Sequence, residues 1–122
     1  MNPESECPQL DRATVARLHE LDPDGRHGVV RRVLTAFEAS LQRMLVQLTA
    51  EQHSGRAEVV SSLAHTLKSS SASVGALALA KACAAVEQRL RHATAADLDA
   101  QVLLLIRECQ FGLRAVRAML QA

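Results

Sequence analysis

Apolar residues recur every three or four positions along most of this chain, which is the spacing that places them on one face of an α-helix. Ala, Leu and Val dominate the apolar residues, whereas the 122-residue chain contains two Phe and no Tyr or Trp, so the aromatic residues typical of strands are scarce. The sequence therefore predicts an all-α protein. The longest regular stretch covers residues 26–52, with apolar positions at Val30, Val33, Leu34, Phe37, Leu41, Leu45 and Leu48.

A short helix is expected near the N-terminus. Asp11 is placed to cap it, and the segment Asp22-Pro23-Asp24-Gly25 has the turn chemistry that ends a helix. Residues 1–9 contain two prolines and no periodicity, so they are expected to form a flexible tail, and residues 10–122 to form a single domain. The apolar positions of the short helix, expected to pack on the main body, are Val15, Leu18 and Leu21.

Three further helices are predicted over about 56–74, 77–92 and from Thr94 toward the C-terminus. Gly55 and Gly75 are suited to the left-handed conformation that commonly ends or separates helices, and Thr94 with Asp97 resembles a capping pair. The connections are short, which favours antiparallel neighbours. We therefore predict an antiparallel up-and-down four-helix bundle with an additional short N-terminal helix.

Composition and charge exclude several classes of function. The formal net charge is +1 with acids and bases interspersed, so no basic stripe is available for nucleic acid. The longest apolar run, residues 102–106, is too short to cross a bilayer, and the acidic N-terminus is unlike an export signal. The three cysteines, Cys7, Cys83 and Cys109, are odd in number and far apart, which indicates a reducing compartment. We expect a cytoplasmic protein without nucleic-acid or membrane partners.

The helix predicted over residues 56–74 has two distinct faces. Val60 and Leu67 fall on the side expected to pack in the core, and His65 lies opposite. A solvated face ordinarily carries long charged side chains, whereas small side chains let another protein approach closely. Position alone also fits an ordinary surface histidine. The small residues around His65, expected to form a docking surface, are Ser61, Ser69, Ala72 and Ala76.

The residues around His65 resemble the signature of the histidine-containing phosphotransfer (HPt) family. The motif runs Ala64-His65-Thr66-Leu67-Lys68-Ser69-Ser70, followed by Gly75-Ala76, Leu79, Cys83 and Val86-Glu87. The resemblance implies that His65 is the phosphorylated residue, that Lys68 is a nearby cation which offsets phosphoryl charge, and that Gly75 is the turn closing the active helix. Ser69 departs from the family pattern, which usually has glycine after the lysine.

The same resemblance implies a phosphorelay intermediate, which accepts a phosphoryl group from one receiver aspartate and passes it to another. Response-regulator receiver domains and a hybrid sensor kinase are the implied partners, and Mg²⁺ is expected on the receiver only. A neutral imidazole keeps a lone pair for attack at neutral pH. The sequence has no Gly-rich nucleotide loop, no Asp cluster for Mg²⁺ and no evident general base beside His65, so we expect a monomeric phosphocarrier, not an enzyme, without a cofactor or metal of its own.

Other polar residues have simpler interpretations. His19, His27, His53 and His92 lack the close spacing of metal ligands. Cys83 and Cys109 lie in apolar stripes and are expected to be buried. Glu87 and Arg91, one turn apart, are interpreted as a helix-surface ion pair or a polar link between helices.

Two alternative functions stay open at this stage. The first is a non-catalytic helical bundle that binds a receiver or another regulator by surface complementarity, and Ser69 in place of glycine gives it some support. The second is the dimerising phosphoacceptor domain of a sensor kinase, but that domain carries its histidine near the start of a helical hairpin and needs an ATP-binding domain after it. The sequence leaves open whether the module is free or part of a larger hybrid kinase, although Met1 and the tail favour a free protein.

Overall fold

The computed structural model describes residues 10–53, 56–92 and 94–121. The tail predicted over residues 1–9, with Cys7, and the helix stop at Gly55 lie outside these residues. The described elements are α2 (Arg12–Glu20), α3 (Val29–Ala50), α4 (Ala57–Ser73), α5 (Leu77–Arg89), the short 3₁₀ helix η1 (Leu90–His92) and α6 (Ala95–Gln121). The all-α prediction is confirmed.

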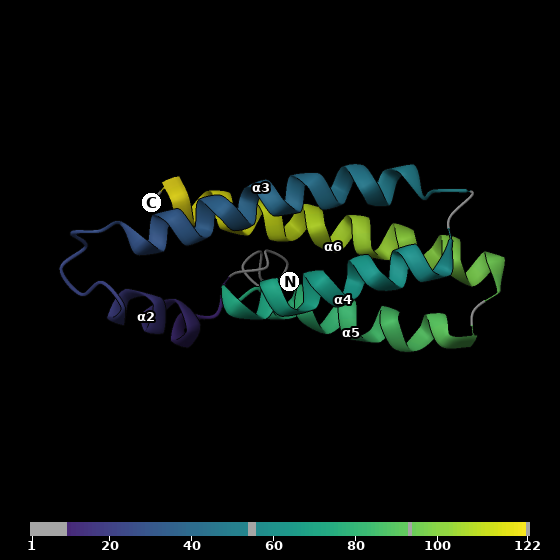
Figure 1. The fold of residues 1–122 in the computed structure, drawn as a ribbon, viewed down its shortest axis with the longest axis horizontal. Coiled ribbons are helices and arrows are strands. Elements are labelled where there is room, and N and C mark those ends of the chain that lie inside the picture. Colours follow the sequence, from purple (N-terminus) through teal and green to yellow (C-terminus); the bar gives the residue numbers. More distant parts are fainter. Residues whose placement is uncertain (1–9, 54–55, 93, 122) are drawn as a thin grey trace, which may run out of the picture.

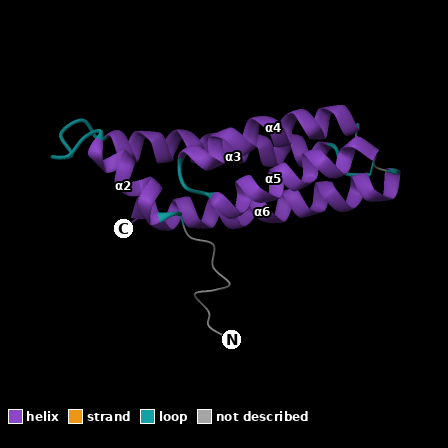
Figure 2. Ribbon diagram, turned by 90° about the horizontal axis from the view of Figure 1, so that it is seen from below, coloured by secondary structure: helices purple, strands orange, loops and turns teal. Residues whose placement is uncertain are grey.

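The four long helices form the predicted bundle (Figure 1). Helix α3 lies beside α6, and α4 lies beside α5, and these two pairs share the most extensive contacts. Seen from below, α2 lies at one end of the bundle (Figure 2). No helix in the described part of the chain is long and apolar enough to cross a membrane.

The core runs along the bundle axis and takes residues from all four long helices. Leu41 of α3, Val60 of α4, Val86 of α5 and Leu105 of α6 are completely buried. The apolar periodicity of the sequence therefore identified the packed faces. Leu21 is an exception: the sequence predicted that it packs on the main body, but it is 70% exposed because α2 ends at Glu20 and the chain turns away at that point.

The connection from α2 to α3 is held by Asp22, which is buried although it is charged. Its Oδ2 atom accepts hydrogen bonds from the backbone N–H of His27 at 3.1 Å and of Val29 at 3.2 Å. Gly28, the residue before α3, has no side chain with which to cap the helix. Asp22 therefore reaches back from the loop to satisfy an N–H group that the first turn leaves unpaired.

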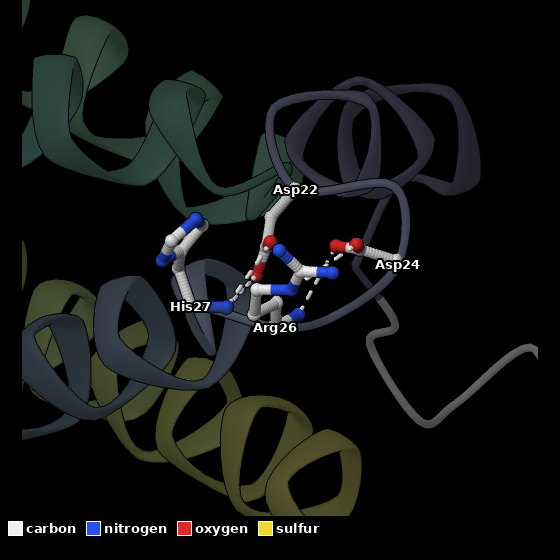
Figure 3. A network of polar contacts seen from close by, with 4 residues as sticks. All are labelled: Asp22, Asp24, Arg26 and His27. Atoms are coloured by element: carbon white, nitrogen blue, oxygen red, sulfur yellow. Dashed lines mark hydrogen bonds and ion pairs between the residues drawn. The ribbon is translucent and has the colours of Figure 1, made fainter.

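The same loop carries an exposed ion pair between Asp24 and Arg26 (Figure 3). Burial, the largest single influence on the pKa of Asp22, raises it, but the hydrogen bonds from Val29 and His27, together with the charge of His27, outweigh burial, and the pKa is lowered. The loop thus keeps Asp22 ionised at the positive end of the α3 dipole.

The turn between α4 and α5 fits closely against the start of α2. Gly75 has a φ of 84°, in the left-handed region where glycine is favoured. Its carbonyl accepts a hydrogen bond of 2.8 Å from the N–H of Asp11, and a Cβ at Gly75 would lie 2.9 Å from that nitrogen. Asp11 in turn caps α2, because its Oδ2 accepts a hydrogen bond of 3.0 Å from the N–H of Thr14. This contact fixes α2 against the end of the α4–α5 hairpin.

Candidate functional site

His65 lies in the middle of α4, on the side away from the core. Its neighbours Ala64 and Leu67 are buried and anchor the helix, whereas the His65 side chain is 68% exposed. The sequence prediction of an exposed imidazole opposite the packed face is therefore correct. The ring is open to solvent and to an approaching molecule.

The structure places Glu87 of α5 against His65. The Oε2 atom of Glu87 lies 3.2 Å from Nδ1 of His65, and its Oε1 atom lies 2.8 Å from Nζ of Lys68. At 2.8 Å, the contact of Oε1 with Lys68 is a close ion pair. One carboxylate, only 18% exposed, therefore links the histidine and the lysine of the motif.

The contact with Glu87 determines which ring nitrogen of His65 keeps an unprotonated lone pair. An ionised carboxylate can only accept hydrogen bonds, so a neutral imidazole in this position carries its proton on Nδ1, and the Nδ1–H group donates a hydrogen bond to Glu87. The other nitrogen, Nε2, then keeps its lone pair. The arrangement presents Nε2 as a nucleophile at a fixed ring orientation.

Glu87 stays ionised in this setting. The contact with Lys68 is the largest influence and lowers the pKa of Glu87, burial acts in the opposite direction, and the hydrogen bond from His65 lowers it further. The net pKa lies below the ordinary value of a glutamate. The carboxylate is therefore charged throughout the neutral range.

The small residues predicted to surround His65 divide into two groups. Ser69 and Ala72 are exposed, and Ser61 is half-buried, so all three can contribute to the surface next to the imidazole. Ala76 does not: it is 6% exposed, because it follows the left-handed Gly75 and packs in the core just before α5. The exposed position expected for Ala76 is therefore wrong.

Sequence reasoning missed the contact between Glu87 and His65. It predicted no general base beside His65 and did not foresee that a carboxylate lies at Nδ1, where it accepts a hydrogen bond from the ring. Of its two interpretations of Glu87, the polar link between helices is confirmed, whereas the ion pair with Arg91 is not formed. The available signal was the turn at Gly75: in an antiparallel hairpin, positions at similar distances before and after the turn face each other, as His65 and Glu87 do.

The other candidate groups do not join this site. Burial raises the pKa of Cys83 and of Cys109 to about 12, so both thiols stay protonated and unreactive at neutral pH. Among the residues that the structure describes, no group of three or more His, Cys, Asp or Glu side chains is arranged to hold a metal ion.

Two comparisons with known proteins match this chain, one by its fold and one by its sequence. The solved structure of histidine-containing phosphotransfer protein B (HptB) from Pseudomonas aeruginosa PAO1 matches this fold with a TM-score of 0.77 and 25% sequence identity, over 93% of this chain and 96% of that chain. No curated protein sequence matches the chain at a significant level. The family model of the Hpt domain matches residues 32–122, which is most of the chain and includes His65, Lys68 and Glu87. The chain therefore belongs to the Hpt domain family, the histidine phosphotransfer proteins of two-component signalling.

Proposed function

We propose that this protein is a phosphorelay intermediate, which accepts a phosphoryl group on Nε2 of His65 from a receiver aspartate and passes it to the aspartate of another receiver. The observation that carries the proposal is the exposed imidazole whose Nδ1 contacts Glu87, because a proton on Nδ1 leaves the lone pair of Nε2 available on a side chain that is 68% exposed. Family membership supports the general reaction, since Hpt domains exchange phosphoryl groups with receiver domains.

The proposed reaction is a direct exchange of the phosphoryl group. The lone pair of Nε2 attacks the phosphorus of an aspartyl phosphate, the P–O bond breaks, and its electron pair returns to the aspartate as a carboxylate. Nδ1 keeps its proton throughout, held by Glu87. The reverse sequence, with a different receiver, delivers the group onward. Little covalent chemistry is asked of the protein, so catalysis depends on position and charge.

Lys68 is proposed to offset the charge of the phosphoryl oxygens. It lies about one helical turn from His65 on the same side of α4, and its side chain is 36% exposed. The flexible four-carbon stem lets the ammonium group move toward a phosphoryl group on Nε2. Its role is electrostatic, since it has no part in forming the bond to phosphorus.

The docking surface is proposed to include Ser61, Ser69 and Ala72. Their short side chains let a receiver approach until its aspartate meets the imidazole. In this proposal the receiver brings the acidic Mg²⁺ site, a hybrid sensor kinase stands upstream, and the protein acts as a monomeric carrier in the cytoplasm without a kinase activity or cofactor of its own.

The test is incubation of the purified protein with a phosphorylated receiver and Mg²⁺, with His65→Gln beside the wild type. We expect acid-labile, alkali-stable phosphate on the wild type and none on the variant, with equal receiver binding by both. If the wild type binds the receiver but gains no phosphate, the protein is a non-catalytic interaction domain and the relay proposal is wrong.

A further inference from the structure

The carboxylate of Glu87 is shared between the ring proton of His65 and the ammonium group of Lys68. We propose that Lys68 moves from Glu87 to the phosphoryl group once His65 is phosphorylated. Glu87 then keeps only its hydrogen bond from the Nδ1–H group of the ring, and through this bond it sets the lifetime of the phosphohistidine. This inference rests on the proposed function and assigns to Glu87 a role as a positioning residue that tunes the leaving group.

The movement of Lys68 follows from the charges in the site. Before phosphorylation the site holds one carboxylate, one ammonium and a neutral ring, and the carboxylate oxygens contact both partners. A phosphoryl group adds roughly 1.5 to 2 negative charges and three strong acceptor oxygens beside the ring. Lys68 is then drawn to the larger charge, and its partly exposed side chain has room to move.

The lifetime of the phosphohistidine depends on the proton at Nδ1. When the P–Nε2 bond breaks, its electron pair returns to Nε2 and the phosphoryl group goes to a carboxylate or to water. With Nδ1 protonated, the departing group is a neutral imidazole; without that proton it is an imidazolate anion, which is a much poorer leaving group. A carboxylate 3.2 Å from Nδ1 favours the protonated, cationic ring. Glu87 thus keeps the phosphohistidine reactive toward a receiver at neutral pH.

Few other charged groups lie near the His65 ring and Glu87. In the described residues, the charged groups in contact with His65 and Glu87 are each other and Lys68. The charges of Glu87, Lys68 and Glu108 of α6 influence the pKa of the nearby Cys83 thiol. The thiol itself stays uncharged because burial raises its pKa to about 12. The ring proton of the phosphohistidine is therefore governed by the balance between Glu87 and Lys68.

The test uses ³¹P NMR of the whole protein phosphorylated by phosphoramidate, a small donor that needs no receiver. The pH at which the phosphohistidine signal titrates reports protonation of the ring. We expect Glu87→Gln to lower this midpoint by about one pH unit and to slow loss of the phosphoryl group at pH 8 by roughly three- to tenfold. Glu20→Gln, which removes the same charge from an exposed position on α2, is the matched control and is expected to match the wild type. An unchanged midpoint in Glu87→Gln overturns the role of Glu87.

The movement of Lys68 is tested by repeating the titration in a Lys68→Met background. If Lys68 has left Glu87, the effect of Glu87→Gln on the midpoint is the same with and without Lys68. If Lys68 still pairs with Glu87, it masks the carboxylate, and the effect grows when Lys68 is removed, which contradicts the movement. Failure of the proposed function can be distinguished from failure of this inference. If the proposed function is wrong, no receiver transfers phosphate to the protein, but the titration still reports the effect of Glu87 on protonation of the phosphohistidine ring.

Discussion

Nδ1 of His65 lies 3.2 Å from Oε2 of Glu87, although 22 residues separate them in the sequence. The contact joins α4 to α5 and fixes the proton of the exposed ring on the nitrogen that faces the protein. It converts an ordinary surface position into one with a defined tautomer. The predictions below follow from this contact and from the elements that hold it in place.

Replacing Lys68 with Met is expected to slow phosphoryl transfer between His65 and a receiver by roughly tenfold, because removing one partly exposed charge from the transition state costs about 1–2 kcal/mol. The effect should fall on the transfer rate constant more than on receiver affinity. Rapid-quench measurement of single-turnover transfer checks this. The control is Lys81→Met, an exposed lysine of α5, for which we expect the wild-type rate. Equal rates for both variants would show that Lys68 has no electrostatic role.

Replacing Gly75 with Ala is expected to destabilise the protein by about 1–3 kcal/mol, because a residue with a Cβ is strained in the left-handed region and the new atom would meet Asp11. Gly25→Ala is the matched control: its φ of 68° is also left-handed, but nothing lies within 4 Å of the added Cβ. Its cost should be about 1 kcal/mol. Urea unfolding of the three proteins measures the difference. If both variants lose the same free energy of unfolding, the close contact between Gly75 and Asp11 does not contribute to the cost of Gly75→Ala.

Asp22 is expected to make the protein less stable in acid. Its pKa is lower in the folded protein than the ordinary aspartate value of 3.8, so its contribution is complete above that pH and is lost as the pH falls through the folded value. Asp22→Asn should therefore be less stable than the wild type at pH 7, and the difference should shrink below about pH 3.8. Thermal unfolding from pH 7 to pH 2.5 checks this, with Asp24→Asn as the exposed control. A difference that is constant with pH would contradict the ionised cap.

The helices could be predicted from the sequence because their signals are local. The predicted helix over 56–74 corresponds to α4 at Ala57–Ser73, and the capping pair of Thr94 and Asp97 forms as expected, with the N–H of Asp97 donating to Oγ1 of Thr94 at 3.2 Å. Apolar periodicity depends only on the geometry of a single helix, so it identified the buried faces before any packing was known.

The errors arose where the outcome depends on how elements meet. Ala76 is on the face of His65 only if α4 continues, but the helix ends at Ser73 and the turn carries Ala76 into the core. The contact of Glu87 with His65 needs the register of the α4–α5 hairpin, and the bonds of Asp22 to the start of α3 need the path of a loop. The path of the loop is not encoded in the periodicity of one helix, and the register of the hairpin follows only when two helices are counted from the turn at Gly75.

The position of the phosphoryl group on the ring tests the central claim most directly. After transfer from a phosphorylated receiver, NMR of the protein labelled with ¹⁵N-histidine identifies the histidine and the nitrogen that carry phosphorus. We predict phosphorus on Nε2 of His65, with the proton on Nδ1. Phosphorus on Nδ1 of His65, or on another residue of the chain, would contradict the account.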